Sequence, residues 1–382
     1  MGSRTMRPSF NGVEPPTTNE MPLHLVWALT NACNVRCIHC YASSAARLPD
    51  ELQYDEIIQN VNILANDGLL DLAISGGEPL MVKHLNHIVE HAVGLGVNVG
   101  IGTNGWALTS TRAKELASAG VGRIQISLDG MQRTHDIVRR RAGMFDRAKR
   151  AIENSIDASL KTKVCFTIHR GNYEQLYEVF EYALELGVSG FNLSQLVATG
   201  RASKDLDLPP SQWRDILMWW HDMRRRHPEV DMSTHLAQIA LVAPELTGSP
   251  MFRGCQAGMA QGAIAANGDV YPCVVLPYTV GNIRRLSVRE IWTNSPVLRT
   301  LRDRRNLAVA CQCCPIREKC GGCRGNAYAL TSNMYESDLR CRYRPTDEHN
   351  GISYANLDDD REQRNSSGEC ELGSQRNDNM TS

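Results

Sequence analysis

The sequence lacks any apolar run long enough to cross a membrane, and its N-terminal stretch lacks the apolar core of a signal peptide. Its 382 residues carry a formal net charge of only −1, so no excess of one sign favours a nucleic acid or an anionic membrane surface. We therefore expect a cytoplasmic protein that binds neither nucleic acid nor a membrane. The length allows one large domain and a smaller one with a sizeable core.

Cysteine is unusually abundant in this chain, which has 13 of them. Because the cytosol keeps thiols reduced, metal ligation explains them better than a disulfide framework. Three lie between residues 33 and 40 and eight between 255 and 341. Of the two that stand apart, Cys165 lies in an apolar run and is expected to be a small core residue, and Cys370 to be a free thiol in a polar tail.

Apolar runs alternate with amphipathic stretches from residue 22 to about 226. The runs predict strands at 24–30, 72–75, 97–103, 123–128, 162–168 and 190–196. The other stretches predict helices at 55–66, 85–95, 110–119, 145–159, 173–186 and 211–226. Six βα units predict a parallel sheet, either open and doubly wound or curved into a partial barrel. Polar residues and cysteines after successive strands favour the barrel, which gathers its active-site loops there.

The first of these strands is followed by Cys33, Cys37 and Cys40, spaced C-x3-C-x2-C. Three thiolates on one tight loop can hold three corners of a cubic iron–sulfur cluster and leave the fourth iron without a protein ligand. A catalytic cluster needs such an open iron, by the logic that separates catalytic from structural zinc sites. A zinc loop and buried free thiols are the alternatives.

Three further motifs follow the next strands: Ser75-Gly-Gly-Glu78, Thr103-Asn-Gly105 and Ser127-Leu-Asp-Gly130. Alone, the first would be an ordinary turn and the second a polar loop. In order after the cysteine triad, they resemble the S-adenosylmethionine (SAM) binding features of the radical SAM enzymes. The resemblance covers about residues 22–226.

This resemblance implies a [4Fe-4S] cluster on the cysteine triad, whose fourth iron chelates the amino and carboxylate groups of SAM. The SAM-binding residues that it implies are Tyr41, Gly76, Gly77, Glu78, Thr103, Asn104, Ser127, Asp129 and Arg201. The two glycines would let backbone approach the ligand closely. Ser127 and Asp129 suit ribose hydroxyls, and Arg201 suits a carboxylate of SAM or substrate. No residue is assigned as catalytic.

The distal cysteines begin with Cys255 and Cys273, separated as C-x12-G-x4-C around Asn267-Gly-Asp269, which is typical of a hairpin turn. Next come C-x2-C-x5-C-x2-C and a last cysteine, formed by Cys311, Cys314, Cys320, Cys323 and Cys341. The pattern resembles the SPASM extension of radical SAM enzymes, which carries two auxiliary four-iron clusters. A zinc ribbon is the alternative.

The residue match implies one auxiliary cluster on Cys311, Cys314, Cys320 and Cys341, and another on Cys255, Cys273 and Cys323. The sequence departs from the common pattern in two places. Cys320 and Cys323 are separated by two residues instead of three, and no second cysteine closely follows Cys255. The second cluster is therefore expected to have an open iron, a non-cysteine ligand or partial occupancy, so we predict one or two auxiliary [4Fe-4S] clusters. Cys313 has no assigned role.

The predicted organisation is a disordered arm (1–21), a partial (β/α)6 TIM-like barrel (22–226), a bridge (227–254), a small cysteine-rich α+β auxiliary-cluster domain (255–345) and a disordered tail (346–382). Two arginine runs, 139–141 and 224–226, are expected to be solvated faces. The first could instead meet an acidic substrate over the barrel mouth.

The resemblance implies an enzyme that takes an electron from a donor such as flavodoxin or ferredoxin and cleaves SAM reductively to a 5′-deoxyadenosyl radical. The run from Cys320 to Tyr328 also resembles relatives that act on haem-pathway tetrapyrroles and quinone-cofactor precursors. We expect oxidation or decarboxylation of a small-molecule intermediate in cofactor or natural-product biosynthesis, since no fused peptide-recognition domain fits before the first strand. The alternatives are a maturase that modifies a ribosomally made precursor peptide and a non-catalytic iron–sulfur or zinc protein.

Overall fold

The structure is a computed structural model that describes residues 20–247, 252–312 and 314–341. Nearly all of the expected arm and the whole expected tail lie outside the described residues, as do Cys313 and Cys370. Met21, assigned to the arm from the sequence, is fully buried in the core.

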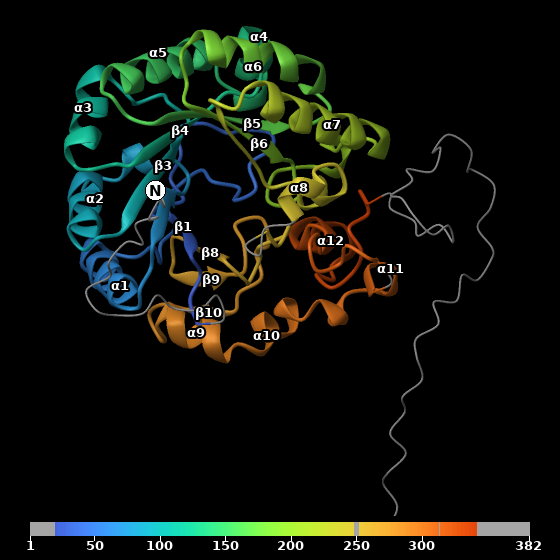
Figure 1. Ribbon diagram of the computed structural model, residues 1–382. Helices are drawn as coiled ribbons and strands as arrows, with labels where there is room; N and C mark the ends of the chain where they lie inside the picture. Colours follow the sequence, from blue (N-terminus) through green and yellow to red (C-terminus); the bar gives the residue numbers. More distant parts are fainter. Residues whose placement is uncertain (1–19, 248–251, 313, 342–382) are drawn as a thin grey trace, which may run out of the picture.

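Seven parallel strands, in chain order, form the larger part of one ten-stranded sheet. They are β1 (His24–Ala28), β2 (Asp71–Ser75), β3 (Asn98–Thr103), β4 (Arg123–Ser127), β5 (Thr162–Ile168), β6 (Gly190–Gln195) and β7 (Asp231–Thr234). Each strand pairs in parallel with the next. The sheet curves, with helices along its outer side (Figure 1). The predicted α/β partial barrel is confirmed.

The barrel helices form the outer layer of the molecule (Figure 1). They are α1 (Tyr54–Asn66), α2 (Leu85–Gly94), α3 (Ser110–Ser118), α4 (Gln132–Arg139), α5 (Met144–Asp157), α6 (Leu176–Glu185) and α7 (Pro210–Arg226), with 3-10 turns η1 (Pro79–Met81), η2 (Tyr173–Gln175) and η3 (Lys204–Leu206). The local sequence determines where several of these helices begin. At the start of α1, for example, Gln53 and Glu56 form a capping box. No helix of the described residues is long and apolar enough to span a bilayer.

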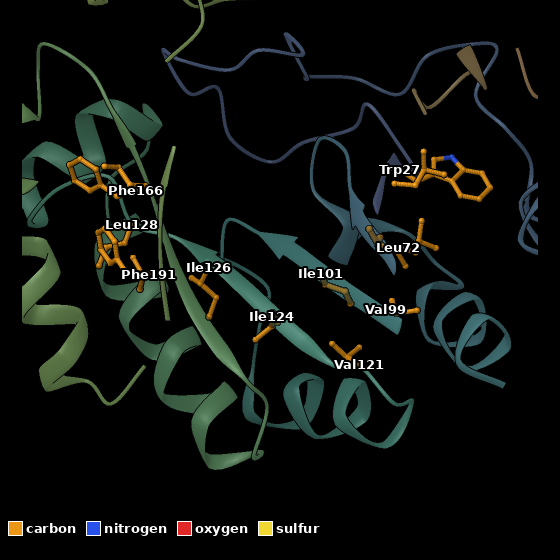
Figure 2. Close-up of a cluster of buried hydrophobic side chains, with 14 of the residues drawn as sticks. Trp27, Leu72, Val99, Ile101, Val121, Ile124, Ile126, Leu128, Phe166 and Phe191 are labelled. Carbon is orange, nitrogen blue, oxygen red and sulfur yellow. The ribbon is translucent and has the colours of Figure 1, made fainter. Parts of the chain in front are cut away.

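Alternate residues of each strand point to opposite faces of the sheet. One set, which includes Trp27, Ile101 and Phe166, is buried between the sheet and the helices (Figure 2). The other set faces the concave side of the barrel and is small or polar near the carboxyl ends of the strands: Ala28, Ser75, Gly102, Ser127, Asn192 and Ser194. Near these ends the concave side therefore presents small and hydrogen-bonding groups, whereas the outer side is mostly apolar.

The C-terminal part of the described chain continues the same sheet. Strand β8 (Gln261–Ile264) pairs in parallel with β1, and β9 (Asp269–Tyr271) and β10 (Gly281–Asn282) follow as antiparallel neighbours. The hairpin predicted around Gly268, which has a φ of 89°, is confirmed. Short helical segments complete this part: η4 (Ala237–Leu241), α8 (Pro244–Thr247), α9 (Val288–Asn294), α10 (Pro296–Arg302), η5 (Arg304–Asn306), α11 (Val309–Gln312) and α12 (Arg324–Thr331).

Within the barrel, one strand and one α-helix were not predicted from the sequence. Strand β7 lies in residues 227–254, expected to be a bridge, and it pairs with β6. Its sequence, DMST, has a single large apolar residue and so gave no strand pattern. Helix α4 occupies only eight residues, too few to give a clear helical pattern in the sequence.

An ion-pair network joins the amino ends of β1, β2 and β4. Asp71 accepts from both terminal nitrogens of Arg123, at 2.6 and 2.7 Å, and also contacts Nδ1 of His24. Although partial burial alone raises the pKa of Asp71, these two partners hold it below its usual range. Gly100 leaves space for the arginine, since a Cβ there would lie 2.9 Å from its side chain.

Candidate active site

Cys33, Cys37 and Cys40 lie on the loop that follows β1. Their side chains pack with Val35 and Met144 in one small apolar cluster. The structure thus brings the three predicted ligands of the first iron–sulfur cluster together on one loop, at the carboxyl end of the sheet, where βα barrels place their active sites.

Gly76 and Gly77 pack against the backbone at the start of this loop. The N–H of Gly77 donates to the carbonyl of Thr30 (2.7 Å), and the next N–H donates to the carbonyl of Ala32 (2.8 Å). A Cβ on Gly76 would lie 2.4 Å from the Thr30 oxygen, and one on Gly77 would lie 2.1 Å from the Ala32 oxygen. Both positions therefore need glycine. The close approach that was expected toward SAM is made here to the backbone of the cysteine loop.

Two charged side chains hold the ends of the cysteine loop. Glu51, which is buried, accepts from the hydroxyl of Thr30 (3.0 Å) and from the following backbone N–H (2.7 Å). Arg201 donates through Nε to the carbonyl of Cys37 (3.1 Å) and through Nη1 to that of Ser44 (2.8 Å). Arg201, expected to bind a carboxylate, thus has two of its guanidinium nitrogens committed to the loop.

Glu78, Thr103 and Asn104 form a buried group behind Cys33. The carboxylate of Glu78 accepts from the Thr103 hydroxyl (2.7 Å) and from the Asn104 N–H (2.8 Å). Burial raises the pKa of Glu78 despite these bonds. The amide Nδ2 of Asn104 donates to Asn34 (2.7 Å) and lies 4.0 Å from the Cys33 sulfur. Glu78 therefore joins the loops after β2 and β3, and Asn104 contacts the cysteine loop directly.

Asp129 is the centre of a fully buried charged network. It contacts Nη2 of Arg139, accepts from His39 Nε2 (3.1 Å) and accepts from the N–H of Thr167 (2.8 Å). Burial alone raises the pKa of Asp129, but Arg139 and His39 hold it well below its usual range. Arg139 also donates to the Cys37 sulfur (3.4 Å). Both oxygens of Asp129, expected to bind ribose, are therefore engaged by the protein.

The expectation that Arg139 is solvated is wrong. Its side chain is 8% exposed, because Asp129 compensates its charge in the interior. His39 was not singled out from the sequence either, although it stands between two of the cysteines. The signal available in the sequence was a histidine within the cysteine loop, between Cys37 and Cys40.

Four nitrogens beside this network have no partner among the described residues: Nδ1 of His39, Nε2 of His135, Nε2 of His169 and Nε of Arg139. The rings of His39 and His169 meet edge to face at 6.0 Å. Burial lowers the pKa of His169 to about 4, so this imidazole is neutral at physiological pH. Buried polar atoms are normally satisfied, so these nitrogens fit a site that holds a polar ligand.

The remaining predicted SAM contacts lie on the concave side of the sheet. The Tyr41 hydroxyl hydrogen-bonds to Ser75, and burial raises the pKa of Tyr41. Ser127 is half-buried at the carboxyl end of β4. Cys165, predicted to be a core residue, is buried, and its sulfur accepts from the Asn192 amide (3.4 Å). These side chains share the barrel end that carries the cysteine loop.

The donors at this loop fit a thiolate-bound cluster. Burial raises the pKa of Cys33 to about 11 and also raises that of Cys37, so neither is a free thiolate at neutral pH. Metal coordination deprotonates such thiols outright. Arg139 then supplies a hydrogen bond and a positive charge to the resulting sulfur of Cys37.

The distal thiols form two adjoining groups. In one group, the Cys323 thiol interacts electrostatically with those of Cys255 and Cys273. The groups meet where the N–H of Cys255 donates to the Cys320 carbonyl (2.9 Å). Burial raises the pKa of both Cys273 and Cys320 to about 12.

Of the other predicted group, the structure shows two pairs: Cys314 interacts electrostatically with Cys311, and Cys320 with Cys341. That these four thiols hold one cluster stays a prediction. No three His, Cys, Asp or Glu side chains of the described residues converge where they could hold a single metal ion.

Arg304 holds the distal groups together. Its buried guanidinium donates to the carbonyls of Arg253 (2.5 Å) and Cys255 (2.9 Å). It fills the space beside Gly321, where a Cβ would lie 1.2 Å from Nη1. Gly321 has a φ of 69°, in the left-handed region that favours glycine, which accounts for a glycine at this position between Cys320 and Cys323.

The barrel, the three-cysteine loop at its carboxyl end and the distal thiol groups define a SAM-dependent radical enzyme with auxiliary iron–sulfur clusters. Sequence profiles agree: that of the radical SAM superfamily matches residues 27–183, and that of SPASM, an iron–sulfur cluster-binding domain, matches residues 255–315. The chain belongs to the radical SAM superfamily and uses SAM and [4Fe-4S] clusters as cofactors.

Curated relatives extend over most of the chain. An AdoMet-dependent heme synthase of Methanosarcina barkeri is 33% identical over 85% of this chain and 97% of its own length. The mycofactocin maturase MftC of Mycolicibacterium smegmatis is 32% identical over 80% of this chain and 78% of its own length. Streptococcus suis SuiB bound to S-adenosylmethionine has the same fold, with a TM-score of 0.71 and 20% identity over 85% of this chain and 78% of that one.

Proposed function

We propose that the protein oxidises a small-molecule intermediate of cofactor biosynthesis, with an iron porphyrin that carries carboxylate side chains as its substrate class. The observation that carries the proposal is the 33% identity to a heme synthase over 97% of that relative's length. The names of the relatives and the cofactors support an enzyme. The porphyrin as its substrate is our proposal.

When bound, SAM and the reduced first cluster supply a 5′-deoxyadenosyl radical, which abstracts hydrogen from an unactivated C–H bond. Haem carries vinyl groups, and oxidative decarboxylation of a propionate side chain produces a vinyl group. One hydrogen atom goes to 5′-deoxyadenosine, the carboxylate leaves as carbon dioxide, and one electron passes to an acceptor. The auxiliary clusters, which the distal cysteines would hold, would supply this acceptor.

The protein's own residues hold and orient these groups. Cys33, Cys37 and Cys40 hold the first cluster, and Arg139 donates to a sulfur of that set. We propose that SAM lies along the concave ends of β2 to β5, against Ser127 and the unpaired nitrogens beside Asp129. Gly76, Gly77, Glu78 and Arg201 act by positioning the cysteine loop and the loops beside it. The fixed geometry sets the distance from radical to substrate hydrogen.

The first experiment is reductive SAM cleavage by anaerobically reconstituted protein, followed as 5′-deoxyadenosine with dithionite as reductant. Cys33→Ala abolishes the product, whereas Cys165→Ala, a thiol outside all three sets, retains it. Three clusters correspond to ~12 iron per chain. A colourless zinc protein, or full cleavage by Cys33→Ala, would contradict the assignment.

The substrate is tested with iron coproporphyrin, an iron porphyrin with a propionate on each pyrrole ring. The expected product has lost carbon dioxide and two hydrogen atoms per side chain, with one 5′-deoxyadenosine formed per loss. SAM cleavage that leaves the porphyrin unchanged would remove this substrate while keeping the enzyme class.

The second candidate is maturation of a ribosomally made peptide, favoured by the 32% identity to MftC. It predicts that a precursor peptide encoded beside the gene, and not the porphyrin, loses mass in the same assay.

A further inference from the structure

Helix α4 turns one side toward the cysteine loop. On that side Arg139 donates to the sulfur of Cys37 at 3.4 Å, and the carbonyl of Val138 accepts from the N–H of Ile38 at 2.9 Å. The helix is therefore in direct contact with the first cluster's ligand loop, both through a side chain and through the backbone.

The other side of α4 faces solvent. Arg133 and Ile137 are four residues apart, which places them on one face of the helix, and Arg140 follows as the C-terminal cap of the helix in a left-handed conformation. All three are exposed, and the side chain of Ile137 is 59% exposed. Figure 1 shows α4 at the rim of the molecule. Ile137 can give a docked protein an apolar contact, and the arginines can give it a polar rim.

Further arginines lie on either side of this face. Arg36 is exposed within the cysteine loop, immediately before Cys37. Arg147, also exposed, lies 4.9 Å from the ring of Trp106, which packs against the cysteine cluster. We call Arg36, Arg133, Ile137, Arg140 and Arg147 the α4 patch.

The charge of the α4 patch is only partly compensated by nearby acids. Among the described residues, none of its four arginines forms an ion pair with a carboxylate. Asp136 is occupied, since its carboxylate accepts from the N–H groups of Gly143 (2.7 Å) and Phe145 (2.9 Å). Asp146 is the exposed carboxylate nearest in sequence. Four arginines against Asp136 and Asp146 leave the patch with a net positive charge beside the cysteine loop.

We propose that the α4 patch is the docking surface for a small acidic electron-carrier protein of the flavodoxin or ferredoxin kind. The inference rests on the proposed function, because only a SAM-cleaving enzyme needs an electron delivered to its first cluster. Opposite charge steers such a carrier to the patch, and Ile137 gives an apolar contact once it arrives. A docked carrier would stand against the helix whose Arg139 touches the Cys37 sulfur, which gives the electron a short path.

The test uses the anaerobic holoenzyme and reduced flavodoxin, with reduction of the first cluster followed by stopped-flow absorbance. The patch variant is Arg133→Glu/Arg140→Glu. Its matched control is Lys161→Glu/Arg225→Glu, which makes the same change in charge at two exposed positions outside the patch. A third variant, Ile137→Ser, removes the apolar contact without changing charge. Dithionite, which needs no docking surface, is the second reductant for every protein.

With flavodoxin at low salt, the patch variant is expected to be reduced at least tenfold more slowly than the control, since electrostatic steering raises association rates by about 10–10³-fold. The wild-type rate falls with added salt and the patch-variant rate does not. Ile137→Ser raises the flavodoxin concentration needed for half-maximal rate and keeps the salt dependence. All variants cleave SAM at the wild-type rate with dithionite.

Equal flavodoxin rates for the patch variant and the control would overturn the proposal. Loss of dithionite-driven cleavage in every protein, wild type included, would instead refute the proposed function. If the patch variant keeps the flavodoxin rate but loses binding of an acidic precursor peptide, the patch is a substrate surface and the electron-carrier assignment is wrong.

Discussion

Asp129→Asn is the sharpest test of how the cysteine loop is supported. The substitution keeps the shape of the side chain and removes its charge. Asp129 is 0% exposed and Arg139 is 7% exposed, so the variant leaves a guanidinium in the interior without its carboxylate. It also weakens the bond from His39 Nε2, which lies in the cysteine loop itself.

The expected cost follows from this burial. Removing one partner of a buried ion pair destabilises a protein by about 3–5 kcal/mol. Asp71→Asn is the matched control, because its carboxylate also pairs with an arginine and a histidine. Those side chains are 23–34% exposed, so solvent reduces the cost to roughly 1 kcal/mol. At ~2 °C per kcal/mol for a domain of this size, Tm falls by ~6–10 °C for Asp129→Asn and by ~2 °C for the control.

The assay is thermal unfolding of the anaerobic holoenzyme, followed by circular dichroism with and without SAM, together with iron analysis. Asp129→Asn is expected to lower Tm equally in both conditions and to reduce the iron held by the first cluster. An unchanged Tm without SAM, combined with weaker SAM binding, would refute the reasoning, because it would make Asp129 a ribose contact instead of an internal support.

Three further outcomes are expected. Gly77→Ala places a Cβ 2.1 Å from the Ala32 carbonyl oxygen, so iron analysis should show the loss of the ~4 iron of the first cluster. Gly94→Ala is the control: a Cβ there has nothing within 4 Å, and the iron content should not change. Burial lowers the pKa of His169 to about 4, so below its usual pKa of 6.5 this side chain binds fewer protons in the folded state than in the unfolded state. The free energy of unfolding in urea should therefore be about 2 kcal/mol lower at pH 5 than above pH 6.5. His169→Gln should lose less stability over this range, and an identical loss would contradict the reasoning. Cys323→Ala should drop the iron content from ~12 to ~8 per chain while dithionite-driven SAM cleavage persists, and a loss of cleavage would show that this thiol group supports the first cluster.

Local patterns were sufficient to predict the barrel. All six strands predicted between residues 24 and 196 are present, because their apolar runs alternate with stretches that have the periodicity of an amphipathic helix. Strand β7 escaped because Asp231 to Thr234 carry little apolar signal, and its place is fixed by pairing with β6 instead. Tertiary pairing thus outweighed local propensity at this edge.

The site shows where sequence reasoning stops. Spacing alone grouped Cys33, Cys37 and Cys40, but the roles of the polar residues depended on what each side chain meets. Arg139 and Arg140 are adjacent in sequence, and one is buried against Asp129 while the other is exposed. Only the orientation of α4, set by its packing on the cysteine loop, separates them.

The pairing of β8 with β1 has a consequence for synthesis of the chain. His24 of β1 lies opposite Gln261 of β8, so one edge of the strand that carries the cysteine loop cannot be closed until the ribosome has added more than two hundred further residues. Until then β1 presents unpaired backbone groups, which are a template for aggregation. Such non-local closure is intrinsically slow. Slowing translation after β3, while this edge of β1 is still open, should therefore lower the yield of folded protein more than the same pause placed after residue 264.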